Sequence, residues 1–206
     1  MSDMETVPFE FLALVGKLKT TFRYEELLAG RRESVADHSY RLSLMVSLYG
    51  NLLETDEKRH RALRMAVVHD IAEAVTGDID YVRVASGEIT REEKKSLEAD
   101  ALDRIGSALS EGHRDAILSL NREYDEGTTD VARFVKALDK LETLLQLVEL
   151  GYRAYDRPEL IANYADAAVE RFPSLRPALA DIKKRLREEF LKGDIEWKPS
   201  YDMPAS

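Results

Sequence analysis

Apolar residues recur at helical spacing along nearly the whole chain, and the alternating runs that mark half-buried strands are scarce. This pattern predicts an all-α fold. The chain has 206 residues, 44% of them apolar, which is enough for one sizeable core. We therefore expect a single-domain helical bundle over residues 1–193. An extended or disordered tail is predicted over residues 194–206, where the periodicity stops and two prolines occur.

Local start and stop signals place the individual helices. Thr90 with Glu93 three residues later is a capping-box signal, Thr55 or Asp56 can cap another helix, and Gly77 is a C-terminal stop. The predicted helices cover about residues 5–18, 34–54, 56–75, 90–109, 112–124, 131–150, 158–171 and 174–192.

The stretch AVVHDIAEAVTGDI, residues 66–79, carries a histidine and three carboxylates in a predicted buried helix and its exit turn. An ionised carboxylate taken out of water is costly unless a partner compensates it. Asp70 lies in the middle of the predicted inward stripe, and Glu73 lies one helical turn from His69 and Asp70 on the same face. The residues of that stripe are Leu63, Ala66, Val67, Ile71 and Ala74. We therefore expect a positively charged group beside this cluster.

Two other polar side chains face the predicted core. His38 shares a helical face with Leu42, Met45 and Tyr49, and Asp139 flanks the leucine stripe of FVKALDKLETLLQ. Taken singly, His38 fits a hydrogen-bonded core histidine, and Asp139 fits a salt-bridge partner of Lys136 or Lys140. Neither residue alone predicts a functional site.

Together with His69 and Asp70, these side chains give two imidazoles and two carboxylates that one divalent cation can satisfy. Such ligands suit cobalt, manganese, zinc, iron, nickel or magnesium, so they do not identify the ion. An ion with an open coordination position lowers the pKa of bound water and polarises a phosphoryl oxygen. The chain has no cysteine, which excludes a Cys-based zinc site and a thiol nucleophile. His60 and His113 lie in charged stretches and are assigned to the surface.

The order His38, His69 with Asp70, then Asp139, on separate predicted helices, resembles the H…HD…D signature of the HD-domain metal-dependent phosphohydrolases. The strings ESVADHSYR, RMAVVHDIAEAVTGDI and EYDEGTTDVARFVKALDKLETLLQ are similar to the small single-domain branch that includes the 5'-deoxynucleotidases. The resemblance implies a helical bundle with one divalent ion held by those four residues. It also implies a homodimer, and hydrolysis of nucleoside 5'-monophosphates, preferentially 2'-deoxy ones, to nucleoside and phosphate.

The resemblance assigns roles to residues outside the ligand set. The glutamate and aspartate of HDxxE…GD serve the chemistry in that family, and they correspond to Glu73 and Asp78. An arginine before the first ligand helix contacts the substrate and corresponds to Arg23, although the tryptophan that usually follows it is a tyrosine here. Lys94 and Lys95 are further candidate substrate-binding cations. Arg23 ranks first because a guanidinium grips phosphate bidentately, whereas the two lysines also fit a solvated helix face.

Charge and composition limit the partners. The net charge of −9 argues against binding a nucleic acid polymer, but a few local cations suffice for one nucleotide. No apolar run approaches the ~18 residues of a membrane span, and no signal peptide is recognisable, so we expect a cytoplasmic protein without a membrane partner. Two alternatives stay open: an HD-type hydrolase of guanosine tetraphosphate or a triphosphate, and a non-catalytic nucleotide-binding sensor with a structural metal. Glu73 and Asp78 argue against the sensor, because a structural ion has no use for them.

Overall fold

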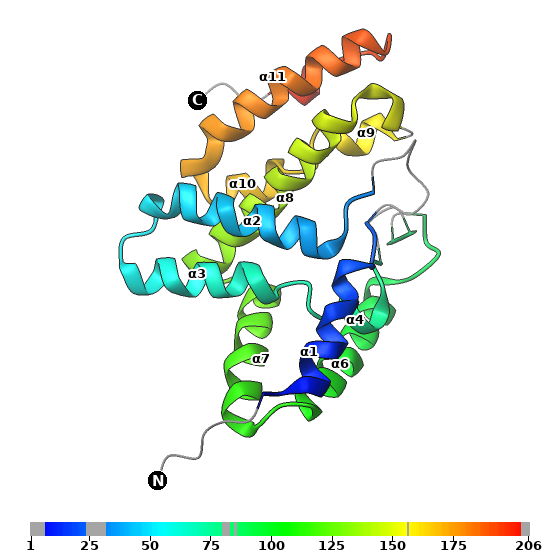
Figure 1. The fold of residues 1–206 in the computed structure, drawn as a ribbon. Helices are drawn as coiled ribbons and strands as arrows, with labels where there is room; N and C mark the ends of the chain where they lie inside the picture. Colours follow the sequence, from blue (N-terminus) through cyan, green and yellow to red (C-terminus); the bar gives the residue numbers. More distant parts are fainter. Residues whose placement is uncertain (1–6, 24–31, 80–82, 85, 156, 203–206) are drawn as a thin grey trace.

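A computed structural model describes residues 7–23, 32–79, 83–84, 86–155 and 157–202. Within these ranges the chain forms helices and one isolated antiparallel bridge between Phe22 and Ser34, and it forms no β-strand (Figure 1). The predicted all-α class is confirmed. Of the helices in the described part of the chain, none is both long and apolar enough to cross a membrane.

The helix starts follow local capping chemistry. Ser34 and Thr90 each form a capping box, with Asp37 and Glu93 respectively, and the Thr55 side chain accepts a hydrogen bond from the third amide of the next helix. The α-helices are α1 (Phe9–Val15), α2 (Val35–Tyr49), α3 (Asp56–Val68), α4 (Glu73–Thr76), α6 (Arg91–Ser107), α7 (Glu111–Glu126), α8 (Asp130–Leu150), α9 (Pro158–Ile161), α10 (Asp166–Glu170) and α11 (Arg176–Lys192). The 3₁₀ helices are η1 (Gly16–Lys19), η2 (Gly50–Leu52), η3 (Tyr152–Ala154), η4 (Pro173–Leu175) and η5 (Pro199–Tyr201).

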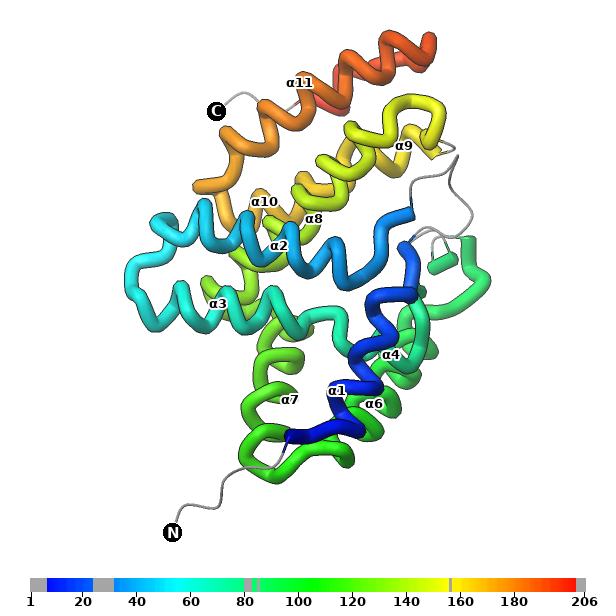
Figure 2. The backbone as a smooth tube through the Cα atoms, viewed as in Figure 1, coloured from blue at the N-terminus to red at the C-terminus, as the bar shows by residue number. Residues whose placement is uncertain are grey.

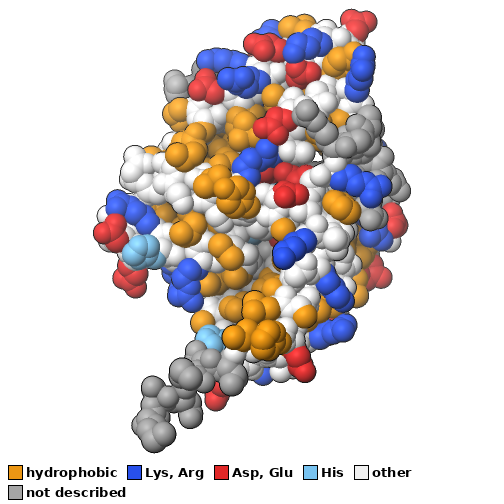
Figure 3. Space-filling view, viewed as in Figure 1, with side chains coloured by type: hydrophobic (Ala, Val, Ile, Leu, Met, Phe, Trp, Pro, Cys, Tyr) orange, Lys and Arg blue, Asp and Glu red, His pale blue; other side chains and the backbone are white. Residues whose placement is uncertain are grey.

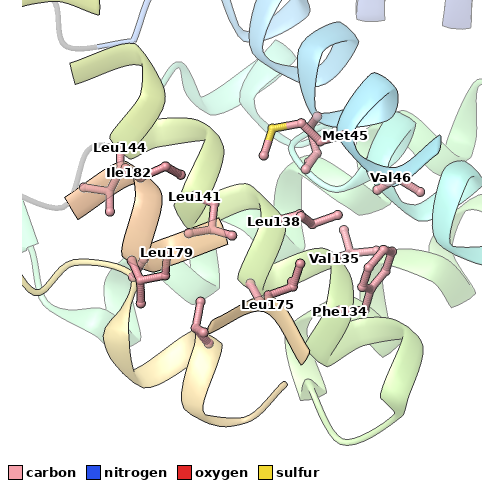
Figure 4. Packing of buried hydrophobic residues seen from close by; sticks show 14 of the residues in the cluster. Met45, Val46, Phe134, Val135, Leu138, Leu141, Leu144, Leu175, Leu179 and Ile182 are labelled. Atoms are coloured by element: carbon pink, nitrogen blue, oxygen red, sulfur yellow. The ribbon is translucent and has the colours of Figure 1, made fainter. Parts of the chain in front are cut away.

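Helix α8 runs through the middle of the molecule and contacts α2, α3, α7 and α11 (Figure 2). Phe134, Leu138, Leu141 and Leu144 of α8 are fully buried. Figure 4 shows α8 between α2, which contributes Met45 to this packing, and α11. Because α8 is buried on almost every side, a polar residue on it needs a partner from the protein.

The helix predicted over residues 56–75 is interrupted, so this prediction is wrong in its continuity. The amides of Ile71 and Glu73 donate to carbonyls three residues back instead of four. Asn121 of α7 is buried, and its Nδ2 donates to the carbonyl oxygens of Val68 at 2.7 Å and His69 at 3.1 Å. The end of α3 is therefore stabilised by a side chain from another helix. The helix predicted over residues 158–171 is likewise divided, into α9 and α10.

The inward stripe predicted for α3 is partly wrong. Leu63 and Val67 are 37% and 57% exposed, whereas Met65 is fully buried. On the neighbouring helix α2, Leu44 and Leu48 are also exposed. These four exposed residues form an apolar surface on α2 and α3, and hydrophobic side chains gather over this face in Figure 3.

The two ends of the chain also differ from the prediction. Helix α1 covers only part of residues 5–18 and continues as η1, while residues 5 and 6 lie outside the described chain. Phe9 and Leu12 are 76% and 49% exposed, so these two apolar side chains of α1 do not face the core. Both α1 and η1 contact α4.

At the C-terminal end, residues 194–202 contain no α-helix, and the backbone is extended at Lys198 and Asp202, but the segment packs on the bundle. Tyr201 is buried, and the Trp197 ring lies edge-on to Phe190 of α11 with centroids 5.2 Å apart. The buried Lys183 side chain donates to the carbonyl of Tyr201 at 2.7 Å. Aromatic residues without helical periodicity therefore extend the core, and residues 203–206 lie outside the described chain.

Candidate active site

Polar side chains from α2, α8 and the end of α3 meet inside the bundle. His38, His69 and Asp139 are buried, and their ligand atoms all lie within 4.8 Å of one another. Asp70 Oδ2 lies 2.9 Å from His69 Nε2 and 3.8 Å from His38 Nε2. The Asp70 side chain is 22% exposed, so the cluster has one side open toward solvent. The structure thus brings together the four side chains that the sequence singles out.

The two histidines present acceptor nitrogens to the same point. His69 Nδ1 donates to the Ala66 carbonyl at 3.0 Å, and His38 Nδ1 donates to the Glu142 carboxylate. In the neutral form that binds a metal, these partners place the proton of each ring on Nδ1, and the two Nε2 atoms then face each other as acceptors at 3.2 Å. Two nitrogens that bind one ion at ~2.1 Å, with an angle of ~90–110°, are roughly 3.0–3.4 Å apart. The donor set therefore fits a single divalent ion.

The surrounding charges favour a cation at this point. Burial and the charge of Arg23 lower the pKa of His38, but hydrogen bonds to Asp139 and Glu142 outweigh them and raise it to about 9. Burial also opposes ionisation of Asp70, yet the charge and hydrogen bond of His69 hold the pKa of Asp70 below its ordinary value. Positive charge between the imidazoles and the carboxylates is therefore stabilised.

Asp139 is oriented by two neighbours on one of its oxygens. Tyr124 of α7 donates its hydroxyl to Asp139 Oδ2 at 2.8 Å, and Lys140 Nζ lies 3.1 Å from the same oxygen. This leaves Asp139 Oδ1 3.3 Å from His38 Nε2, facing the cluster. Burial and the charge of Asp139 raise the pKa of Tyr124 well above its ordinary value, so its hydroxyl stays a donor. The ion pair between Asp139 and Lys140, which the sequence offered as an alternative to a metal site, is present together with the cluster.

Replacing Tyr124 by phenylalanine should weaken metal binding by about 10–100-fold, because it removes a support of Asp139 without touching a ligand. Lys140 still holds Asp139, so the fold should lose only about 1–3 kcal/mol. Titration with a divalent metal, followed by calorimetry, measures the affinity. Tyr40→Phe, at an exposed tyrosine of α2, is the matched control. Wild-type affinity in Tyr124→Phe would contradict this role.

Glu142 holds His38 through Nδ1, the ring nitrogen that does not face His69, and sequence analysis did not identify this glutamate. Its side chain is fully buried, and it accepts hydrogen bonds from His38 Nδ1, from Arg23 Nη1 at 3.3 Å and from Arg41 Nε at 2.6 Å. A carboxylate in this position fixes the tautomer of a ligand histidine. The available signal was a glutamate on the apolar stripe of α8, one turn after Asp139.

Arg23 lies in the same ion-pair network. It is buried, its Nη1 lies 3.3 Å from Glu33 Oε2, and its Nη2 donates to Thr143 Oγ1 at 3.0 Å. Its backbone amide donates to the Glu33 carbonyl at 3.0 Å, beside the bridge that precedes α2. Arg23 thus has protein partners next to the supports of His38. Its contact with a substrate stays a prediction.

Glu73 is the first residue of α4, and its Oε2 atom is buried without a hydrogen-bond partner in the described part of the chain. Burial raises the pKa of Glu73 well above its ordinary value, and the charges of Asp70 and Asp78 add to this effect. Arg23 and Lys94 act in the opposite direction, so all four charged groups lie near Glu73. A carboxyl group in such surroundings favours its protonated form.

The turn after α4 carries Asp78 beside the cluster. Gly77 has φ of 73°, a left-handed conformation that favours glycine, and it ends α4 as predicted. Lys94 of α6 donates to the carbonyl of Ile79 at 2.8 Å, so α6 lies against this turn. Lys94 Nζ also lies 3.6 Å from Glu98 Oε1, one helical turn later in α6. Such a pair is expected if Lys94 belongs to a solvated helix face. Lys95 is exposed.

The chain is similar to known proteins over most of its length. Residues 15–168 match the HD domain family. The chain is 32% identical over 183 residues to "5'-deoxynucleotidase HDDC2" of Mus musculus, covering 87% of this chain and 86% of that protein. It is 34% identical over 194 residues to "5'-deoxynucleotidase hdd1" of Schizosaccharomyces pombe, covering 91% and 93%. A crystal structure of a predicted metal-dependent phosphohydrolase from Magnetospirillum magnetotacticum superposes with a TM-score of 0.73 at 26% identity, covering 92% and 94%. The chain therefore belongs to the HD domain family.

Proposed function

We propose that the protein is a metal-dependent 5'-nucleotidase that hydrolyses 2'-deoxynucleoside 5'-monophosphates to nucleosides and inorganic phosphate. The observation that carries the proposal is the convergence of two histidines and two aspartates beside a buried oxygen of Glu73 that has no hydrogen-bond partner among the described residues. Relatives that bear the name 5'-deoxynucleotidase, and that match most of this chain, support the substrate class.

One divalent ion would be held by His38, His69, Asp70 and Asp139. When bound, the ion supplies charge neutralisation at phosphoryl oxygens and a lowered pKa for coordinated water. Cobalt, manganese, zinc, iron, nickel and magnesium all accept such ligands, so the metal is left open.

The remaining roles belong to charged residues beside the cluster. Glu73, whose protonated form is favoured by burial and by two neighbouring aspartates, donates a proton to the leaving 5'-oxygen. Asp78 accepts a hydrogen bond from the attacking water and thereby orients it. Arg23 and Lys94 place positive charge near Glu73, where the phosphate would lie. Lys95 is exposed and would contribute only at longer range.

A panel of nucleotides tests this function. The purified protein, after elemental analysis of its metal, should release phosphate from deoxynucleoside 5'-monophosphates faster than from the matching ribonucleotides. Release of pyrophosphate from guanosine tetraphosphate, or of triphosphate from a nucleoside triphosphate, would replace the proposal with another HD-type hydrolase. Full metal occupancy without any hydrolysis would indicate a nucleotide-binding sensor.

We also propose a cytoplasmic homodimer. The apolar surface on α2 and α3 supports self-association, because Leu44, Leu48, Leu63 and Val67 leave apolar area in water. A second copy covering this face would bury that area.

A further inference from the structure

A second group of cations, away from the metal ligands, lines a hollow of about 190 Å³ between α8 and α10. Three of its five lining residues are Arg133, Lys136 and Arg171, and the other two are alanines. In the described part of the chain, no carboxylate oxygen lies within 4.0 Å of their charged nitrogens. This is unexpected in a chain that has 39 acidic and 30 basic residues.

Separate contacts hold these cations in place. The Lys136 ammonium lies 4.1 Å from the centroid of the Tyr124 ring, and its aliphatic chain packs beside Gly127. Arg171 Nη2 donates to the Gly127 carbonyl at 2.8 Å. Arg133 Nε is buried and has no hydrogen-bond partner in the described part of the chain. The wall of the hollow therefore includes an arginine whose shielded Nε–H lacks an acceptor.

An anion in the hollow would relieve the electrostatic repulsion among the three cations. Guanidinium groups present planar donors that match the oxygens of phosphate, and lysine adds a point charge. Pockets for drug-sized ligands measure about 300–1,000 Å³, so this hollow is too small for a whole nucleotide and large enough for one tetrahedral oxyanion.

We propose that this hollow, lined by Arg133, Lys136 and Arg171, binds a small tetrahedral oxyanion such as inorganic phosphate. Lys136 connects the hollow to the candidate active site, because it covers the ring of the tyrosine whose hydroxyl supports Asp139. Binding here is independent of hydrolysis, so it can be measured whether or not the proposed function is correct.

Isothermal titration with inorganic phosphate tests the proposal. Phosphate can also bind at the metal cluster, so the titration is done in the wild-type protein and in the Asp70→Ala variant, in which the hollow is intact. Phosphate should bind to both proteins. Arg133→Gln and Lys136→Met, each combined with Asp70→Ala, should weaken this binding by about 10-fold or more. Arg104→Gln, at an exposed arginine of α6, is the matched control and should leave it unchanged.

Any of three results would overturn the proposal. One is loss of all phosphate binding in Asp70→Ala, which would assign it to the metal cluster alone. Another is unchanged affinity in both Arg133→Gln and Lys136→Met. If circular dichroism shows that Arg133→Gln is misfolded, Arg133→Lys keeps the charge, removes the guanidinium, and should also weaken binding. Displacement of phosphate by thymidine 5'-monophosphate in Asp70→Ala would contradict a site for free oxyanions.

Discussion

Replacement of Asp70 by alanine should abolish metal binding and phosphate release from dAMP together. The variant leaves two imidazole nitrogens 3.2 Å apart but removes the carboxylate that lies beside both of them. A catalytic ion contributes several kcal/mol to transition-state stabilisation. Because each 1.36 kcal/mol is a factor of ten in rate, hydrolysis should fall by at least about 1,000-fold. Elemental analysis and phosphate release measure the two losses on the same sample.

Asp103→Ala is the matched control, since Asp103 is an exposed aspartate of α6. It should keep wild-type metal content and turnover. Asp70 is partly exposed, so its replacement should leave the helical circular dichroism spectrum unchanged. Normal turnover in a folded Asp70→Ala protein would refute the site.

Replacement of Glu73 by glutamine should preserve metal binding and lower kcat for dAMP by about 100–10,000-fold, the range for loss of a general acid. Glutamine has a similar shape but cannot deliver a proton to the leaving oxygen. The defect should shrink with p-nitrophenyl phosphate, because nitrophenolate leaves without a proton. Comparing kcat for the two substrates therefore separates proton donation from positioning.

The pH dependence of kcat is a second test of the Glu73→Gln variant. A general acid works in its protonated form, so wild-type kcat should fall as pH rises through the raised pKa of Glu73. Glu73→Gln should lack this alkaline limb, and Glu57→Gln, at an exposed residue of α3, should keep it. If Asp78→Asn, and not Glu73→Gln, shows the leaving-group dependence, then Asp78 is the acid.

The parts of the fold that depend on neighbours in sequence could be predicted. Ser34 and Thr90 begin helices through partners three residues away, and the apolar periodicity identified the all-α class. The interruption after Val68 could not be predicted, because the side chain that stabilises it, Asn121, lies on another helix. The packing of Tyr201 on α11 likewise depends on tertiary contacts.

At the candidate active site, too, features of a single helix could be predicted, whereas contacts between helices could not. His38 and Asp139 were identifiable because a charged or polar group on an apolar helix face is unusual, and His60 and His113 are exposed as expected from their charged surroundings. Tyr124 was not identifiable, since a tyrosine on a helix is ordinary until α7 packs against α8. The hydrogen bond from Tyr124 to Asp139 forms only when these two helices are in contact, so the sequence of one helix does not predict it.

The four clustered residues come from segments that lie far apart in the chain: α2, the end of α3, and α8. An ion held between them would close long loops as a disulfide does, without a covalent bond, and an unfolded chain would offer no such site. At a free ion concentration of 100 times Kd, this linkage adds about 2.7 kcal/mol to the free energy of unfolding. The free metal concentration would then affect the folded fraction of the protein as well as its rate of hydrolysis.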